Sequence, residues 1–174
     1  MAATRSVLTF NEFEQLPDRP GKTELLEGEL IELPPAKRKH QEIAHRLYEQ
    51  LKTFRPVTET GSAVFLEMGY QLRSDTWLQP DVGITQPQQE GDDYFQGSPL
   101  LAVEVVSESN RAIDINGKVE PYLAHGAAEV WGIYPEQHHA RIFKPGGTAE
   151  TRSGRFASQL LSGAEFDLDA ILGE

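Results

Sequence analysis

One apolar run limits the folds open to this chain more than any other segment. Residues 100–106 read Leu-Leu-Ala-Val-Glu-Val-Val, and Glu104 alone interrupts the hydrophobic side chains. A short run of this kind is typical of a strand buried on both faces of a sheet. An ionised carboxylate there is costly unless a metal, a cation or several hydrogen-bond donors meet it. Glu104 is therefore a candidate functional residue.

The composition excludes several classes of protein. A length of 174 residues predicts one domain, 1–174, large enough to bury a core without disulfides or a structural metal. Cysteine is absent, which excludes disulfides, thiolate nucleophiles and thiolate metal sites. No run could span a membrane, so we expect a soluble, cytoplasmic protein. The formal net charge of -11 argues against a large DNA-binding surface but is compatible with a small basic patch or an acidic metal site.

The order of the expected elements predicts a mixed α/β domain. Thr9 and Glu12 have the spacing of a capping box, which indicates a short helix before Pro17. The pair Glu27-Gly28 lies between two apolar stretches and predicts a hairpin. The next elements predicted are a helix over 39–54, strands over 63–72 and 77–85, and a loop over 86–98. After the strand with Glu104, the pattern predicts a helix over 111–125 ended by Gly126, a strand hairpin over 129–134 and 140–144, and a short helix near 167–172.

Three residues could together carry chemistry. Asp81 follows Pro80 in a strand-like segment, Glu104 lies in the buried strand, and Lys118 lies on the next predicted helix. Two carboxylates on neighbouring strands can hold a hard divalent cation, with water and a substrate phosphate as the other ligands. A nearby lysine can orient the attacking water and offset developing charge on phosphate. This combination suits metal-assisted hydrolysis of a phosphodiester.

The same residues carry a resemblance to a known family. The motifs that carry it are Pro80-Asp81, Val103-Glu104-Val105-Val106-Ser107, Lys118 with Tyr122 and Gly126, Glu129-Val130-Trp131, the early segment Glu24 to Leu30, and His40 at the start of a helix. With these motifs the chain resembles, from residue 10 to residue 134, the Uma-two family, within the PD-(D/E)xK restriction-endonuclease-like superfamily.

The resemblance implies a restriction-endonuclease-like fold, with a central mixed β-sheet flanked by helices. It also implies Mg²⁺ or Mn²⁺ as cofactor, Asp81 and Glu104 as metal ligands, Lys118 as a third catalytic residue, DNA as substrate and a homodimer. One position departs from the superfamily pattern: Val106 stands two residues after the second acid, where that pattern has a lysine. The family resemblance points to Lys118 as the replacement.

Each candidate also has a structural interpretation. Asp81 after Pro80 is equally compatible with a turn, and Glu104 with a buried ion pair, although acids in such positions are enriched at functional sites. Lys118 on a helix is by default a solvated lysine. His40 lies on the helical face that carries Ile43, so a partly buried core histidine is the simpler interpretation. If it faces Asp81 instead, it could contact phosphate or the metal's water.

The acidic residues of the early hairpin differ in their positions. Glu24 and Glu27 would point to opposite faces of one unbroken strand, and Glu27 beside Gly28 fits a turn. Glu24 is therefore the better candidate for an accessory acid near the metal.

Two functional hypotheses follow. The first is a metal-dependent endonuclease that uses Asp81, Glu104 and Lys118. The second is a nuclease fold retained as a non-catalytic dimeric scaffold or protein-binding module, which the acidic charge and Val106 favour. The two differ in whether the three side chains converge.

Overall fold

The fold has four helices and three sheets in the part of the chain that the structure, a computed structural model, describes: residues 7–54, 59–107 and 112–173. The helices are α1 (Phe10–Glu14), α2 (Arg38–Leu51), α4 (Ala112–Ala124) and α5 (Leu168–Leu172). Thr9 closes the capping box of α1 with Glu12, as predicted. None of the described helices is long and apolar enough to cross a membrane.

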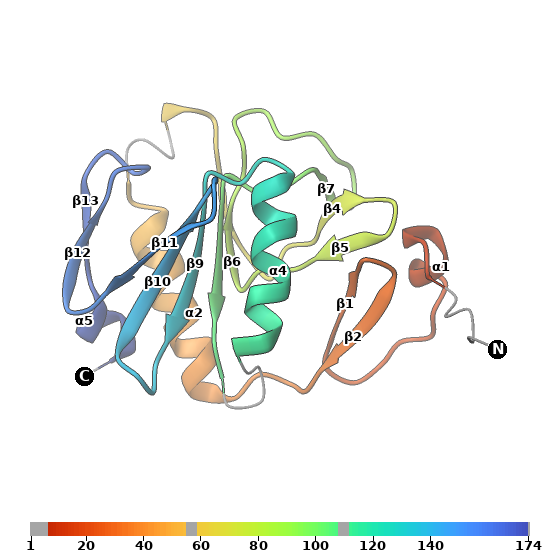
Figure 1. The fold of residues 1–174 in the computed structure, drawn as a ribbon, viewed down its shortest axis with the longest axis horizontal. Helices are drawn as coiled ribbons and strands as arrows, with labels where there is room; N and C mark the ends of the chain where they lie inside the picture. The colour runs from red at the N-terminus through yellow and green to blue at the C-terminus, as the bar shows by residue number, and fades with distance from the viewer. Residues whose placement is uncertain (1–6, 55–58, 108–111, 174) are drawn as a thin grey trace.

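A six-stranded mixed sheet forms the centre of the molecule (Figure 1). Its strands, in spatial order, are β11 (Thr148–Arg152), β10 (His139–Lys144), β9 (Glu129–Tyr134), β8 (Leu101–Val105), β6 (Val82–Ile84) and β3 (Val64–Leu66). Strands β8 and β9 are parallel, and the other neighbours are antiparallel. All five residues of β8 are buried, which confirms the prediction from the apolar run.

A second sheet of five strands lies beside it (Figure 1). Its spatial order is β2 (Glu29–Leu33), β1 (Lys22–Leu26), β5 (Thr76–Leu78), β4 (Tyr70–Arg73) and β7 (Phe95–Gln96). The turn between β1 and β2 has positive φ at Glu27 and Gly28, as a tight hairpin requires, and Glu27 is the turn residue that the sequence predicted. A separate hairpin of β12 (Arg155–Ser158) and β13 (Ala164–Asp167) follows β11.

Two predicted strands are each divided between the two sheets. The segment 63–72 breaks into β3 and β4, and the segment 77–85 breaks into β5 and β6. Pro80 has no N–H to donate to a ladder, and a Cβ on Gly69 would lie 2.3 Å from the Trp77 ring. These residues mark the bend, so the prediction of two unbroken strands is wrong there. The bend places Asp81 at the junction of the sheets.

The helices cover opposite faces of the six-stranded sheet, with α2 on one side and α4 on the other (Figure 1). Along β8, Val103 and Val105 pack in the core with α2, whereas Ala102 packs in the core that includes Tyr122 of α4. Because side chains alternate along a strand, Glu104 falls on the α4 face. That second core also includes residues of β4 and β5, so α4 lies between the two sheets.

The other predicted elements are mostly present. The hairpin β9–β10 and the last helix lie where they were predicted, and Asp167 caps α5. The predicted start of the α4 helix at Arg111 lies outside the described residues. The segment 86–98 is not wholly a loop, because it contains β7. Strands β11, β12 and β13 were not predicted.

Candidate active site

Asp81 and Glu104 face each other across two antiparallel strands. The register pairs Val82 with Val103, so one step further along each strand brings Asp81 opposite Glu104. The N–H of Val105 donates to Asp81 Oδ2 at 2.7 Å, which fixes one oxygen of that carboxylate. Both acids are buried, at 4% and 5% exposure. The pairing of β6 with β8 therefore brings the two predicted acids together.

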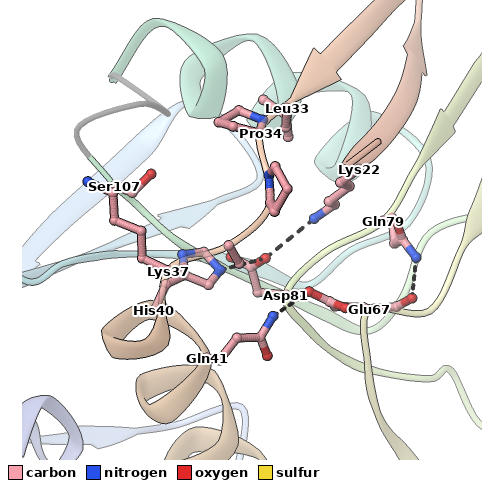
Figure 2. Close-up of a pocket in the computed structure, with 13 residues that line it drawn as sticks. Lys22, Leu33, Pro34, Lys37, His40, Gln41, Glu67, Gln79, Asp81 and Ser107 are labelled. Carbon is pink, nitrogen blue, oxygen red and sulfur yellow. Dashed lines mark hydrogen bonds and ion pairs between the residues drawn. The ribbon is translucent and has the colours of Figure 1, made fainter. Parts of the chain in front are cut away.

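Two side chains reach the other oxygen of Asp81 from opposite sides (Figure 2). His40 Nε2, from the first turn of α2, lies 3.2 Å from Asp81 Oδ1, and Lys22 Nζ, from β1, lies 3.4 Å from it. Burial alone would raise the pKa of Asp81, but Lys22, His40 and the Val105 N–H together lower it well below its ordinary value. Asp81 does lie at a bend, directly before β6, but it is buried and held by several donors, and His40 takes the alternative position beside Asp81.

The same contacts also shift the pKa values of His40 and Lys22. Burial would lower the pKa of His40, yet the hydrogen bond and charge of Asp81 raise it above its ordinary value. Burial also opposes the charge on Lys22, but Asp81, Glu24 and Glu104 outweigh this and raise its pKa. Lys22 therefore stays protonated at neutral pH.

Glu104 is held from α4. Lys118 Nζ lies 3.3 Å from Glu104 Oε1, and the Tyr122 hydroxyl donates to the same oxygen at 3.2 Å. Burial raises the pKa of Glu104 to about 7; Lys118 and Lys22 oppose this rise, whereas Asp81 and Glu24 add to it. One carboxyl of the pair is therefore firmly ionised, and the other titrates near neutrality.

Lys118 lies inside the protein and not in solvent. It is 2% exposed, and its Nζ also lies 2.5 Å from Glu24 Oε2. Glu24 is fully buried on β1 and accepts from the Gln79 N–H at 2.9 Å through its other oxygen. The default interpretation of Lys118 as a surface lysine is thus wrong. From α4, Lys118 thus contacts both Glu24 of β1 and Glu104 of β8.

A glycine allows α4 to approach the sheet closely enough for these contacts. Gly132 of β9 pairs with Glu104 in the parallel ladder, and a Cβ there would lie 2.6 Å from Ile115 Cδ1 and 3.0 Å from the Tyr134 ring. Ile115 lies almost one turn before Lys118 on α4. The absence of a side chain at Gly132 thus lets α4 pack close enough to the sheet for Lys118 to contact Glu104.

The connected side chains form what we call the acidic cluster: Lys22, Glu24, His40, Asp81, Glu104, Lys118 and Tyr122. A cavity of about 330 Å³ opens on the Asp81 side of this cluster (Figure 2). It is lined by residues of β1, the segment after β2, the start of α2, and the bend between the sheets: Gly21, Lys22, Leu33, Pro34, Pro35, Ala36, Lys37, His40, Gln41, Glu67, Gln79, Asp81 and Ser107. Glu24, Glu104 and Lys118 do not line it. The cluster consequently has a cavity side and a buried side.

Two members of the cluster were not among the predicted site residues. Lys22 was not singled out in the sequence, and Tyr122 was noted only as part of a family motif. A signal existed for Lys22: it stands two residues before Glu24, so in a strand both side chains point to the same face. For Tyr122 the signal was its position four residues after Lys118, which is the same face of a helix.

The donor set suits one kind of metal ion. Among the described residues, no group of three or more Asp, Glu or His side chains is arranged to hold a metal. Asp81 and Glu104 nevertheless supply the hard oxygen donors that Mg²⁺ takes when one or two carboxylates, waters and a phosphate complete its shell. The two acids therefore fit Mg²⁺ or Mn²⁺ and do not form an all-protein cage.

Comparison with known proteins is consistent with this geometry. A crystal structure described as a putative nuclease belonging to DUF820, from Anabaena variabilis ATCC 29413, superposes with a TM-score of 0.83 at 19% identity, over 95% of this chain and 97% of that chain. A cryo-EM structure of a DrdV–DNA complex gives a TM-score of 0.37 at 12% identity, over 66% of this chain and 11% of that chain, too low to define a shared fold. No curated protein matches the chain.

The mixed α+β fold, with a central mixed sheet flanked by helices, is that of the nuclease-fold neighbour, so the predicted fold class is confirmed. The model of the Uma2 family, described as "Putative restriction endonuclease", matches residues 10–170. The chain belongs to this family, as the motifs between residues 10 and 134 predicted, and the match extends to the C-terminal hairpin.

Proposed function

We propose that the protein is a metal-dependent endonuclease that hydrolyses phosphodiester bonds of DNA. The observation that carries this proposal is the facing pair of buried acids, Asp81 and Glu104, beside a cavity with a lysine and a histidine in its wall. Membership of the Uma2 family supports it. The overall acidic charge is compatible with it if contact with DNA is confined to the cavity and its rim.

In this proposal Asp81 and Glu104 hold Mg²⁺ or Mn²⁺. When bound, the ion would lower the pKa of the attacking water and polarise the scissile phosphate. The Val105 N–H keeps Asp81 in place, and Lys118 with Tyr122 keeps Glu104 in place. Lys118 thus acts through Glu104 as a positioning residue. Such outer partners typically change metal affinity or activity by about 10- to 100-fold when removed.

His40 and Glu24 are proposed as accessory residues. His40 lines the cavity beside Asp81, so its ring can contact phosphate or a water molecule there. Glu24 does not line the cavity and acts through Lys118, to which it is bound. We further propose a homodimer, since cutting both strands of a duplex generally requires two sites; sedimentation of the purified protein tests this.

Plasmid cleavage tests the function. Supercoiled plasmid incubated with the protein and Mn²⁺ or Mg²⁺ is expected to be nicked or linearised, and EDTA is expected to stop the reaction. Glu104→Ala should abolish cleavage, whereas Glu120→Gln, an exposed acid on α4, should not. Cleavage that persists unchanged in Glu104→Ala would contradict the assignment. Absence of both cleavage and metal binding in the wild type would favour the non-catalytic scaffold.

A further inference from the structure

The acidic cluster contains two lysines, and only one of them faces the cavity. The side chain of Lys118 is 3% exposed and is held between Glu24 and Glu104. The side chain of Lys22 is 16% exposed, lines the cavity, and contacts Asp81. A ligand that enters the cavity therefore meets Lys22, whereas it cannot reach Lys118 without a rearrangement of the buried acids.

Lys22 also contacts Asp81, one of the two acids proposed to hold the metal. Its Nζ lies 3.4 Å from Asp81 Oδ1 and 3.8 Å from Glu24 Oε1. No other lysine or arginine among the described residues forms an ion pair with Asp81. Of the two lysines that line the cavity, Lys22 and Lys37, Lys22 is thus the one that contacts Asp81.

The backbone supports this placement of Lys22. Lys22 pairs with Leu33 at the open end of the β1–β2 hairpin, and Gly21 before it has φ of +92°. A Cβ at Gly21 would lie 2.2 Å from the Leu33 carbonyl oxygen. The close approach of the two chains at this point fixes where Lys22 enters the cavity.

We propose that Lys22, and not Lys118, contacts the reacting phosphate of the DNA backbone. The proposal rests on the nuclease function above. In the reaction, the oxygen of one water molecule forms a bond to phosphorus, and the ester P–O bond breaks with its electron pair passing to the leaving oxygen. The water loses a proton to solvent and the leaving oxygen takes one from solvent, which gives a phosphomonoester and a hydroxyl. Lys22 transfers no proton; its charge offsets the negative charge that develops on the phosphate oxygens.

Single-turnover cleavage with saturating Mn²⁺ tests this role. Lys22→Met is expected to lower the rate by roughly 10²- to 10³-fold, as does the loss of other donors to a developing oxyanion. Lys22→Arg should recover part of the rate, because it keeps the charge. Lys52→Met is the matched control, since Lys52 lies at the far end of α2 in an exposed ion pair with Glu49. Equal rates for Lys22→Met and the wild type would overturn the proposal.

Phosphate binding provides a readout that does not depend on turnover. Inorganic phosphate titrated into the wild-type protein with Mn²⁺ is expected to bind, and Lys22→Met is expected to weaken this binding at least 10-fold, with Mn²⁺ affinity unchanged or higher. Binding that is the same in both proteins would overturn the proposal even if the wild type cleaves DNA. If the wild type cleaves nothing yet binds phosphate through Lys22, the nuclease function fails and the assignment of the phosphate site stands.

A measurement on the unmodified protein covers the case in which Lys22→Met fails to fold. NMR of the lysine ε-ammonium groups, with phosphate and Mg²⁺ added, is expected to shift the signal of Lys22 and to leave that of Lys118 in place. A shift of Lys118 without one of Lys22 would assign the phosphate contact to the buried lysine and overturn the proposal.

Discussion

Asp81 on the cavity side of the acidic cluster and Glu104 on its buried side are held in opposite ways. On the cavity side, Lys22, His40 and a backbone N–H hold Asp81, and its pKa is lowered. On the buried side, burial dominates at Glu104 and raises its pKa to about 7, despite Lys118. The comparison teaches that the number of donors, and not burial by itself, decides which of two neighbouring acids remains ionised.

The two lysines of the acidic cluster, Lys118 on the buried side and Lys22 on the cavity side, also differ. Their substitution gives the largest expected difference in the free energy of unfolding. Lys118→Met leaves Glu24 and Glu104 buried without their cation and is expected to cost about 3–5 kcal/mol in the free energy of unfolding. Lys22→Met should cost distinctly less, because His40 and the Val105 N–H still hold Asp81 and water reaches the cavity. Urea unfolding in EDTA measures both. Equal losses would mean that the distinction between the two sides is wrong.

The pH dependence of stability sharpens the contrast between the two acids. The native pKa of Glu104 is above its ordinary value of 4.5, so the native state holds more protons there, and its contribution to stability is lost as pH rises toward about 7. The native pKa of Asp81 is below its ordinary value of 3.8, so its contribution is present above that pH and is lost as pH falls below it.

Chemical unfolding of Glu104→Gln and Asp81→Asn in EDTA, from pH 3 upward, separates these two effects. Between about pH 4.5 and pH 7 the wild type should lose stability relative to Glu104→Gln. Relative to Asp81→Asn, it should lose stability in the acid range, and again as pH rises through the raised pKa of His40, which Asp81 maintains. Parallel curves for the two variants would show that both carboxyls titrate alike.

The smallest effect is expected for the hydroxyl on the buried side. Tyr122→Phe removes the donor to Glu104 Oε1 and keeps the ring, which is fully buried. Since Lys118 still holds that oxygen, we expect a loss of about 1.5 kcal/mol in the free energy of unfolding. Thermal or urea unfolding measures it, with Tyr94→Phe as the control on an aromatic cluster distant in sequence. A loss of stability as large as that of Lys118→Met would contradict the prediction that the hydroxyl has the smallest effect.

The sequence predicted those parts of the site that depend on local pattern. Glu104 stood out because one charge interrupts an apolar strand, whereas Asp81 and Lys118 were favoured by the resemblance to the family's motifs. Lys22 was missed because its role depends on β1 in the second sheet, which is brought to Asp81 only by the bend at Pro80. No local pattern encodes that approach.

The fold likewise has elements that local patterns predicted and features that they did not. Helices α1 and α2 and the hairpin β9–β10 were predicted from capping and periodicity. The transfer of the chain between the sheets at Gly69 and Pro80 was not predicted. All residues of β5 and β6 are buried, and an apolar pattern reports burial without reporting in which sheet a strand pairs.

Anomalous scattering from crystals soaked in Mn²⁺ tests the central claim most directly. We expect one strong peak bound by carboxylate oxygens of both Asp81 and Glu104, and its loss in crystals of Glu104→Gln. A peak elsewhere in the molecule, or none at these two acids in a protein that cleaves DNA, would contradict the account.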